Sequence, residues 1–529
     1  MHTELDTLEA RRQELQARFD ASRSQPDRNR LGQFATPQRL ALDIARYLRT
    51  LWPRAEAAIR FCDPAVGSGA FYSAFRSVFH ADRVDSALGI EIDPELAKIA
   101  RDLWGSHGLH VMQGDFTRLV ATPGPPLSPN LIFANPPYVR HHHLGRNYKT
   151  ALQRLTLHST GVAVNGLAGL YVYFVLLASQ WMEEGGLAVW LIPSEFMDVN
   201  YGEALRRYLT ERVTLLRLHR FDPREVQFDD ALVSSAVVVI RKAVPTDSDM
   251  IRFTLGGTIE EPATWQEVPI RDLRRVPKWT RFPSPGQLVF SEEAGERGRE
   301  FSDFFRVQRG IATGCDKVFI LPREQARNLG LPDQCLRPIL PSPRHLHSTI
   351  LEPDDEGYPK IENPLALIDC RFPEPIVREQ FPALWEYLQE AEKEGIRSRY
   401  LLRKREPWYA VEQRRPAPFL CTYMGRGTDE KRPFRFIWNK TPATATNLFL
   451  VIYPRGQLGD LLRVRPQLAA SVFEFLGGIS ADDLRGAGRV YGGGLHKMEP
   501  SELGHVPAVT LVERLPELLD GKQQLALFG

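Results

Sequence analysis

The chain of 529 residues is long enough for two or three domains that each bury a core, and 43% hydrophobic with 25% charged residues is an ordinary globular composition. No apolar run of about 18 residues occurs, which argues against a membrane span. The five cysteines lie far apart without a CxxC pair, which argues against a disulfide framework or a zinc site and favours the reducing cytoplasm. The net charge of +2 leaves an anionic partner undecided, so only the distribution of charge is informative.

Residues 1–30 predict an N-terminal helical arm. Leu5, Leu8, Leu15 and Phe19 fall on roughly one face of a helix, and the polar stretch SRSQPDRNR follows. Two heptads are too few for a coiled coil, so we expect an arm that is either docked or flexible. An arm of this length is too short to hold a nuclease fold.

From residue 31 to 245, strand and helix patterns alternate. The segment ATPQRLALDIARYLRTL predicts a helix with Thr36 as its N-cap and Pro37 at the first helical position. AIRFCDPAVGSGAF and ALGIEIDPELAKIARDLW each predict a strand, a turn and a helix, and LHVMQGDF and NLIFANPP predict two more strands. This rhythm predicts an α/β fold, a parallel sheet with helices on both faces, whose ligands bind beyond the carboxyl ends of the strands.

Three acidic residues follow successive predicted strands. Asp63 opens the Gly-rich turn DPAVGSG, Glu91 ends the next strand, and Asp115 precedes Phe116 in QGDF. Acids at these places can accept hydrogen bonds from a ribose and from an adenine amine, and Phe116 can stack on the adenine ring. The alternative is that such acids are helix N-caps or exposed turn residues, but three of them at successive strand ends favour a nucleoside site.

The turn after the first of these strands distinguishes between nucleoside cofactors. A dinucleotide site needs a GxGxxG turn whose amides face a pyrophosphate, whereas GSGAF lacks the third glycine and Asp63 would repel phosphate. A cofactor that has no phosphate and carries a cationic amino-acid end fits this turn better. The sequence therefore favours S-adenosylmethionine.

The fourth strand ends in the rigid corner NPPY, Asn135 to Tyr138. Proline restricts the residue before it to extended geometry and a Pro-Pro pair is stiff, so the Asn135 amide is held at a fixed angle. Its Oδ1 and the Pro136 carbonyl form two acceptors for a planar amino group, whose lone pair then faces an electrophilic methyl group, and Tyr138 can stack on the ring. The alternative is a proline turn that only ends a strand.

The second half of the chain lacks this alternation. Residues 246–300, rich in proline and charge, predict a connector, residues 301–515 a mixed α+β domain, and residues 516–529 a tail. From Ile396 to Lys440 twelve Lys or Arg stand against four acids, interleaved with aromatic residues. This pattern is typical of nucleic-acid binding, and its alternative is a charged surface over an aromatic core. The candidate DNA-binding residues are Arg403, Lys404, Arg405, Arg414, Arg415, Arg426, Lys431, Arg432 and Arg435.

These motifs carry a family resemblance. NPPY, DPAVGSG, GIEID, QGDF and GQFATPQRLA are similar to motifs IV, I, II, III and X of S-adenosylmethionine-dependent DNA N6-adenine methyltransferases of the gamma class, TaqI-like enzymes in particular. FFRVQRGIATGCDKVFIL and RVYGGGLHKMEPSEL resemble the start and end of the target-recognition domain of those enzymes. The resemblance implies a Rossmann-like class I methyltransferase sheet with an antiparallel last hairpin, followed by a DNA target-recognition domain.

The resemblance also implies roles for individual residues. The catalytic residues are Asn135, Pro136 and Tyr138, and Tyr138 with Phe228 holds a flipped adenine, because the N6 amine in a duplex is out of reach. The cofactor-binding residues are Thr36, Asp63, Ala65, Gly67, Glu91, Ile92, Asp115, Phe116, Asn135, Pro137 and Phe174.

The sequence thus predicts a site-specific, adenine-specific DNA methyltransferase that binds double-stranded DNA as a monomer, in the cytoplasm at the nucleoid. We expect the modification component of a restriction-modification or phage-defence system, with any nuclease or further subunit on a separate chain. The alternatives are a methyltransferase of protein glutamine or RNA, because NPPY also suits a glutamine amide, and a DNA-specificity subunit with an inactive methylase half.

Three consecutive histidines, His141 to His143, follow the NPPY corner. Consecutive side chains point in different directions and no acid or cysteine lies nearby in sequence, so we expect no metal there. With the segment GRNYK that follows, they predict a basic, flexible lid that touches DNA or cofactor.

Overall fold

In the computed structural model, the strands and helices of the first half of the chain assemble around one sheet. The structure describes residues 2–24, 27–28, 31–52, 58–119, 128–222, 234–276, 278–283, 299–426, 433–491 and 495–518. The chain divides into two compact units, Met1–Val289 with Tyr491–Gly493 and Phe290–Val490 with Gly494–Gly529. No helix in the described ranges combines the length and the hydrophobicity that crossing a membrane requires.

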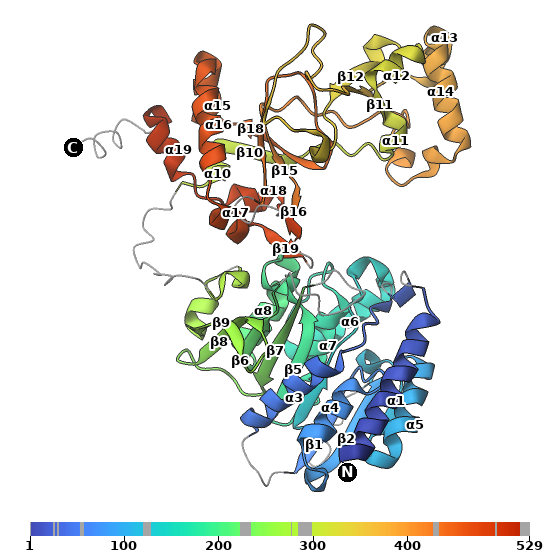
Figure 1. Ribbon diagram of the computed structural model, residues 1–529, viewed down its shortest axis with the longest axis vertical. Coiled ribbons are helices and arrows are strands. Elements are labelled where there is room, and N and C mark those ends of the chain that lie inside the picture. Colours follow the sequence, from blue (N-terminus) through green and yellow to red (C-terminus); the bar gives the residue numbers. More distant parts are fainter. Residues whose placement is uncertain are drawn as a thin grey trace, which may run out of the picture. The chain divides into compact units, whose positions relative to one another are not determined.

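The first unit is built on a nine-stranded sheet with the strand order β3-β2-β1-β4-β5-β7-β6-β8-β9 (Figure 1). The strands are β1 (Ile59–Asp63), β2 (Val84–Glu91), β3 (His110–Gln113), β4 (Leu131–Ala134), β5 (Leu187–Pro193), β6 (Thr214–Arg220), β7 (Ser235–Arg241), β8 (Met250–Gly257) and β9 (Pro262–Pro269). The main helices are α1 (His2–Ala21), α3 (Gln38–Leu51), α4 (Ala70–Val78), α5 (Pro94–Trp104), α6 (Arg146–Thr160), α7 (Leu170–Ala178), α8 (Glu203–Glu211) and α9 (Ile270–Leu273).

Strands β3, β2, β1, β4 and β5 are parallel neighbours, and β7 is inserted antiparallel between β5 and β6. Successive residues along a strand point to opposite faces of the sheet, and each face carries its own hydrophobic core. Phe61 and Phe133 share a core with α3, α4 and α5, whereas Cys62 and Ile132 share a core with α7 and α8. The α/β class with helices on both faces is therefore confirmed, and so is the antiparallel hairpin that the resemblance implied.

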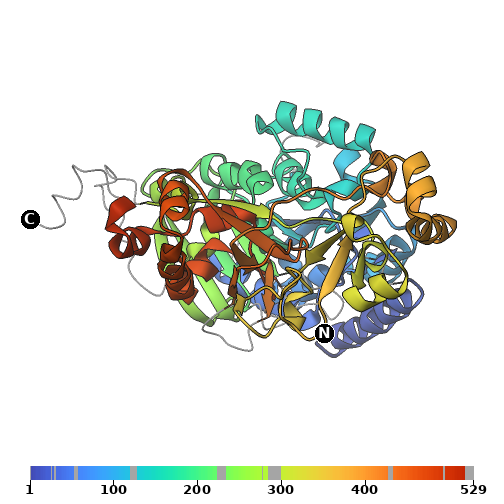
Figure 2. The same cartoon turned by 90° about the horizontal axis from the view of Figure 1, so that it is seen from above.

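The N-terminal helix α1 is docked, which decides between the two forms of arm that the sequence left open. It packs against α4 and α5, and Figures 1 and 2 show it in dark blue at the surface of this unit. Leu5, Leu8 and Leu15 contact the core beneath, and Phe19 is only 2% exposed. The apolar face predicted from the sequence is the face that is buried.

Thr36 is not the N-cap of the following helix, contrary to our expectation. Helix α3 begins at Gln38 with Pro37 as its N-cap and no side-chain capping bond. The hydroxyl of Thr36 instead accepts a hydrogen bond from Asn135, a residue 99 positions away. The capping rule predicted Thr36 wrongly because its hydroxyl oxygen accepts from Asn135 and not from a backbone N–H of α3.

The predicted boundary at residue 245 is wrong. Strand β8 pairs in parallel with β6, β9 pairs antiparallel with β8, and α9 follows directly. Residues 250–273, which we expected within a connector, thus extend the sheet at its edge. Their proline and charge suit an edge position, where one side of the strand faces solvent.

The second unit has a mixed α+β architecture, as expected. Its described residues form three sheets with the strand orders β10-β18-β15-β17-β13, β11-β14-β12 and β16-β20-β19. The strands are β10 (Phe305–Arg309), β11 (Ile320–Pro322), β12 (Leu336–Ile339), β13 (Ile350–Leu351), β14 (Leu365–Ile368), β15 (Phe419–Thr422), β16 (Met424–Arg426), β17 (Phe436–Asn439), β18 (Phe449–Pro454), β19 (Arg489–Tyr491) and β20 (Leu495–Lys497). The helices are α10 (Phe301–Phe304), α11 (Asp316–Phe319), α12 (Arg323–Asn328), α13 (Glu374–Gln380), α14 (Pro382–Lys393), α15 (Gly456–Val464), α16 (Ala469–Gly478), α17 (Ala481–Ala487), α18 (Pro500–Gly504) and α19 (Val509–Arg514).

The end of this unit lies beyond the predicted boundary at residue 515. A 3-10 turn at Pro516–Leu518 follows α19, and Leu518 is fully buried in the core of the five-stranded sheet and its helices. The remainder of the predicted tail lies outside the described residues.

Candidate active site

The candidate site residues of the first unit lie at one edge of the sheet. Strands β3, β2, β1 and β4 are parallel neighbours, so their carboxyl ends meet at this edge. Asp63 and Glu91 end β1 and β2, and Asp115 and Asn135 follow β3 and β4 within two residues. The fold therefore brings together the four residues that the sequence pattern singled out.

Asp63 is a buried carboxyl group. Its side chain is 1% exposed, and its Oδ1 accepts a hydrogen bond from the Ala65 backbone N–H at 3.0 Å. Burial raises the pKa of Asp63 to about 8, which the Ala65 amide opposes and the Glu91 carboxylate reinforces. A cation brought next to this group would favour its charged form, because opposite charge lowers a carboxyl pKa.

Glu91 is held by two backbone amides from two different loops. Gly67 N–H donates to Oε2 at 2.9 Å, and Asp93 N–H donates to Oε1 at 2.9 Å. Burial raises the pKa of Glu91, and these amides oppose the rise. Each carboxylate oxygen retains a second lone pair, so both can still accept from the hydroxyls of a ribose.

The surroundings of Glu91 leave room for a ligand. Gly67 has a φ of +55°, and a Cβ there would meet no described atom within 4 Å. The neighbouring Ile92 is apolar and yet 64% exposed. An open turn and an uncovered apolar side chain beside an oriented carboxylate fit a nucleoside with a flat ring.

Asp115 is both a cap and part of a small hydrogen-bond network. Its Oδ1 accepts from the backbone N–H and the hydroxyl of Thr117, at 3.0 Å and 2.7 Å. Its Oδ2 accepts from the Tyr148 hydroxyl at 3.1 Å and lies 3.2 Å from Arg118 Nε. The sequence did not identify Tyr148, whose only signal was its place in GRNYK, and this segment enters helix α6 where we expected a flexible lid.

Phe116 and Phe174 form one aromatic cluster. Their ring centroids lie 5.2 Å apart, and Trp181, which the sequence did not single out, lies 5.4 Å from Phe116. Phe116 and Phe174 are 3% and 6% exposed. The two rings that we expected against adenine are thus brought together next to Asp115.

Asn135 carries a buried oxygen that has no hydrogen-bond donor among the described residues. Its Nδ2 donates to the Phe34 carbonyl at 3.0 Å and to the Thr36 hydroxyl at 3.1 Å. Because a carbonyl can only accept, the nitrogen must face Phe34 and the oxygen must face the other way. The side chain is therefore fixed with an unpaired acceptor directed away from the protein contacts that hold it.

Tyr138 is anchored beside this acceptor. Its hydroxyl donates to the Leu191 carbonyl at 3.1 Å, and its ring lies 5.7 Å from Phe34. Its backbone N–H donates to the Gly32 carbonyl at 3.1 Å, and a Cβ at Gly32 would lie 2.4 Å from that same nitrogen. The glycine of GQFATP is thus required for the close approach of this segment to the NPPY corner.

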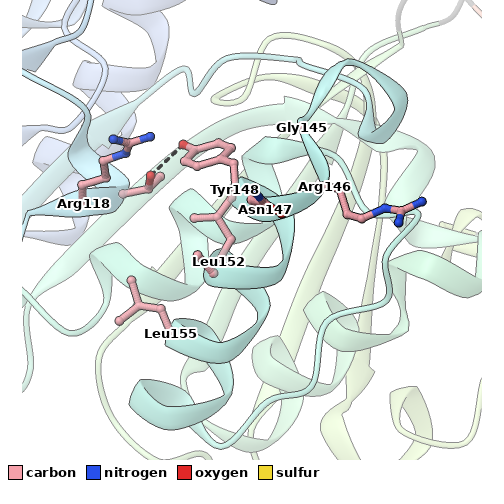
Figure 3. Close-up of a pocket in the computed structure, with 9 residues that line it drawn as sticks. Arg118, Gly145, Arg146, Asn147, Tyr148, Leu152 and Leu155 are labelled. Carbon is pink, nitrogen blue, oxygen red and sulfur yellow. Dashed lines mark hydrogen bonds between the residues drawn. The ribbon is translucent and has the colours of Figure 1, made fainter.

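A cavity of about 840 Å³ lies beside the network of Asp115. It is lined by Thr117, Arg118, Gly145, Arg146, Asn147, Tyr148, Ala151, Leu152 and Leu155. The hydroxyls of Tyr148 and Thr117 lie 2.8 Å apart, and Figure 3 shows Tyr148, Leu152 and Leu155 among the residues that line this cavity. Asp63, Glu91 and Asn135 do not line this cavity, so it adjoins the candidate site without containing its reactive end.

Two further expectations concern residues near the site. Phe228, the second expected partner of a flipped base, lies outside the described residues. His141–His143 form a 3-10 turn, and within the described parts of the chain no three His, Cys, Asp or Glu side chains gather as a metal site.

The basic, aromatic stretch of the second unit is largely core. Among its aromatic residues Trp408, Tyr409, Phe419, Tyr423 and Phe434 are each at most 4% exposed, which supports the alternative of a charged surface over an aromatic core. In this structure these rings pack inside the cores of the second unit.

The candidate DNA-binding residues whose side chains the structure describes divide into two groups. Arg405 donates to the carbonyls of Ala312 and Thr313, Arg435 to those of Pro343 and Leu346, and Arg414 to the Gln308 side chain. These three side chains bind other segments of their own unit, so they have a structural role that the sequence did not predict. Arg403, Lys404 and Arg415 are exposed, and the side chains of Arg426, Lys431 and Arg432 lie outside the described residues.

The sheet order and the carboxylates at its strand ends define a class I S-adenosylmethionine-dependent methyltransferase fold, and S-adenosylmethionine is its cofactor. Residues 130–227 match the Eco57I restriction-modification methylase family, and residues 278–525 match the family of the C-terminal domain of the type II methyltransferase M.Eco57I. The second match starts within the residues that we expected to be a connector.

Relatives extend this likeness over most of the chain. The type II methyltransferase M.XamI of Xanthomonas campestris pv. amaranthicola is 27% identical over 471 residues, which are 87% of this chain and 82% of the relative. The type II methyltransferase M.AccI of Acinetobacter calcoaceticus is 23% identical, over 92% of this chain and 86% of the relative. The chain is thus similar to type II methyltransferases over most of its length.

Solved structures are more distant. The type IIL restriction-modification enzyme MmeI in complex with DNA matches over 84% of this chain with 13% identity and a TM-score of 0.47, and the chain spans 60% of that protein's length. The type IIG restriction endonuclease BpuSI matches at a TM-score of 0.44, again with 60% of its length spanned.

Proposed function

We propose that this chain transfers a methyl group from S-adenosylmethionine to the N6 amine of an adenine in double-stranded DNA, as the modification component of a restriction-modification system. The observation that carries the proposal is the unpaired Asn135 Oδ1 at the end of β4. The homology to restriction-modification methylases supports DNA as the substrate. The NPPY corner supports the adenine amine as the target.

Asn135 and Pro136 supply acceptors for the two N–H groups of the target amine. An exocyclic amine of adenine is a weak nucleophile because its lone pair is delocalised into the ring. Two fixed acceptors that draw on its hydrogens favour a pyramidal nitrogen, whose lone pair is then free to attack. Orientation and electrostatics perform this task, and no strongly basic side chain is required.

The remaining site residues orient the cofactor and the base. The cofactor supplies an electrophilic methyl group on a sulfonium. Asp63 would lie at its cationic end and Glu91 would accept from its ribose. Asp115, whose oxygens are taken by Thr117, Tyr148 and Arg118, would exchange one of these partners to accept from its adenine amine. The open Gly67 turn and exposed Ile92 border its ring, and Thr36 acts through Asn135. Tyr138, with Phe228, holds the flipped adenine.

Double-stranded DNA is the partner that the second unit would recognise, as a target-recognition domain. The exposed Arg403, Lys404 and Arg415 supply positive charge to phosphates, which positions the duplex without reading its sequence. One copy of the chain suffices for this arrangement, with cleavage left to a separate protein. The chain would then act where DNA is, at the nucleoid.

The substitution Asn135→Ala tests the catalytic assignment. Methyl transfer to duplex DNA should fall by at least about a hundredfold, because an acceptor used in the transition state is removed. Binding of S-adenosylmethionine should stay within about twofold, because the cofactor carboxylates are untouched. Tritium transfer and calorimetric titration measure the two effects, with Asn328→Ala, an exposed residue at the end of α12, as a matched control. Wild-type turnover by Asn135→Ala would refute the assignment.

The chemical nature of the product needs a separate experiment. DNA from a methylation-free host that expresses the chain should carry N6-methyladenine at one recurring sequence in modification-sensitive sequencing. Label in protein or RNA alone would instead overturn the proposal in favour of another amide or amine substrate.

A further inference from the structure

Helix α1 reaches the two loops that orient Glu91. One loop follows β1 and contains Gly67 and Ser68, and the other follows β2 and contains Asp93. Each of these loops contributes one backbone amide to the Glu91 carboxylate. Each also receives one arginine from α1 or the residues directly after it.

Arg12 contacts the first loop from a buried position. It is 3% exposed, and its Nη1 donates to Ser68 Oγ at 3.0 Å. Glu9, itself 4% exposed, pairs with the other side of the guanidinium at 2.7 Å and 2.8 Å. A buried ion pair gains little net stability over apolar packing. The informative feature is that the pair with Glu9 holds Arg12 where it can donate to the glycine-rich turn.

Arg23 contacts the second loop. Its guanidinium lies 2.7 Å from Asp93 Oδ2, donates to Gln33 at 3.1 Å, and stacks over Phe19 at 4.2 Å. Asp93 is also the N-cap of α5, where it accepts from Glu95 N–H and Leu96 N–H. The carboxylate is therefore fixed from two sides, and its own backbone N–H is fixed on Glu91.

We infer that Arg12 and Arg23 are positioning residues for cofactor binding. Arg12 acts through Ser68 on the adjacent Gly67 amide, and Arg23 acts through Asp93, so the arm sets both donors that orient Glu91. This inference rests on the proposed role of Glu91 toward the ribose of S-adenosylmethionine. It assigns to the N-terminal arm a part in cofactor affinity beyond covering apolar surface.

Two substitutions separate positioning from folding. Ser68→Ala removes the hydrogen bond of Arg12 to the loop and leaves the buried Glu9 pair intact, and Arg23→Ala removes the ion pair with Asp93. The matched control is Arg11→Ala, on the same helix, whose side chain is 50% exposed and pairs with Glu14. All variants are made in the full chain.

Calorimetric titration with S-adenosylmethionine is the main readout. We expect about a three- to tenfold weaker affinity for Ser68→Ala and for Arg23→Ala, the range that the removal of one orienting hydrogen bond produces. Arg11→Ala should bind as the wild type does, and Arg23→Lys, which keeps the ion pair, should recover most of the affinity. Hydrogen exchange of the cofactor-free variants should show faster exchange at the Gly67 and Asp93 amides.

The outcomes distinguish this inference from the proposed function. Wild-type affinity and exchange in both Ser68→Ala and Arg23→Ala, with weakened binding in Glu91→Ala, would overturn the positioning role alone. Unchanged binding in Glu91→Ala would overturn the assignment of Glu91 and this inference with it. Weakened affinity in the two variants with unchanged thermal unfolding supports the inference.

Discussion

The two ends of the Asn135 side-chain amide differ in their hydrogen bonding. Its nitrogen is satisfied twice by Phe34 and Thr36, and its buried oxygen has no donor among the described residues. A buried acceptor without a partner costs about 1–3 kcal/mol, so a donor from a ligand or a water would stabilise it. Under the proposed function, the amine of the target base would supply this donor.

The protonation of Asp63 should make the stability of the protein depend on pH. Because burial raises the pKa of Asp63 to about 8, the side chain is mostly neutral at pH 7 in the cofactor-free protein. A folded pKa above the unfolded value stabilises the protein at low pH, and this contribution disappears as the pH rises toward 8. If Asp63 holds the cationic end of the cofactor, as proposed, this cation would reverse the preference because it stabilises the carboxylate.

Binding of S-adenosylmethionine should therefore release a proton from Asp63. We expect affinity to rise between pH 6 and pH 8, by at most about tenfold per pH unit for one proton. Titration in buffers of different ionisation enthalpy counts the protons. Asp63→Asn should bind more weakly and no longer release this proton, while it retains the titration of the cofactor's own amino group near pH 8. Equal proton release from both proteins would contradict the assignment.

At the scale of elements, two segments far apart in the chain build the reactive corner. The loop before α3 supplies Gly32, Phe34 and Thr36, and the loop after β4 supplies Asn135 and Tyr138. Contact between them requires a residue without a side chain in the left-handed region, and Gly32 has a φ of +66°. The GQFATP segment thus packs against the NPPY corner and hydrogen-bonds to Asn135 and Tyr138.

Gly32→Ala should damage this corner. Its Cβ would lie 2.4 Å from Tyr138 N in an unfavourable backbone region, so the free energy of unfolding should fall by more than about 1 kcal/mol. Methyl transfer should fall more than cofactor affinity, because Asn135 and Tyr138 shift together. Gly105→Ala is the control, with a φ of −58° and no described atom within 4 Å of its Cβ. Urea unfolding and turnover that match this control would show that the close approach is not required.

The short turn Leu402–Lys404 contains two exposed basic residues, and the basic residue directly after it points into the unit. Arg403 and Lys404 are exposed beside Tyr400, and Lys404 Nζ donates to the Tyr400 hydroxyl at 2.7 Å. Arg405 turns inward to the carbonyls of Ala312 and Thr313. Neighbouring basic residues thus serve solvent-facing and structural roles that composition does not separate.

Replacement of both Arg403 and Lys404 by alanine should weaken DNA binding without changing thermal stability. The slope of log affinity against log salt should decrease by up to about 2, because each phosphate that the protein no longer neutralises keeps roughly one bound counterion. Arg405→Ala should lower the melting temperature instead, since two carbonyls are left without their donor. Fluorescence anisotropy at several salt concentrations and thermal unfolding measure these effects. An unchanged salt slope in the double variant would exclude this turn from the DNA interface.

At the scale of the whole molecule, catalysis and recognition are assigned to units with separate cores. The core residues of the first unit lie in two clusters around the nine-stranded sheet, and those of the second lie in three clusters of their own. Chains of this kind often unfold in more than one step. A ligand stabilises only the part that binds it in its native form.

Scanning calorimetry should therefore show two transitions, of which S-adenosylmethionine raises one. At a concentration of about a hundred times Kd, the stabilisation of the cofactor-binding unit should be about 2.7 kcal/mol. Duplex DNA containing the recognition sequence should raise the other transition. A single transition that both ligands shift equally would mean that the two units unfold as one.

The sequence by itself determined the α/β class, the acids at the strand ends and the rigid corner that presents Asn135. These features depend on neighbouring residues: strand and helix periods, glycine at turns, and the restriction that proline places on the residue before it. The same local logic located the apolar face of α1. Asp63, Glu91 and Asn135 lie at the predicted ends of their strands. The carboxyl ends of parallel strands meet at one edge of the sheet, so these residues come together there.

Only the tertiary structure decided which atoms of those residues have partners. The Asn135 amide is oriented by residues about a hundred positions away, and Thr36, read locally as a cap, serves that amide instead. Tertiary packing also placed β8 and β9 on the sheet and buried aromatic rings that a basic composition had suggested for bases. Long-range contacts make these choices, because the free energy of burying a side chain depends on what the rest of the chain brings against it.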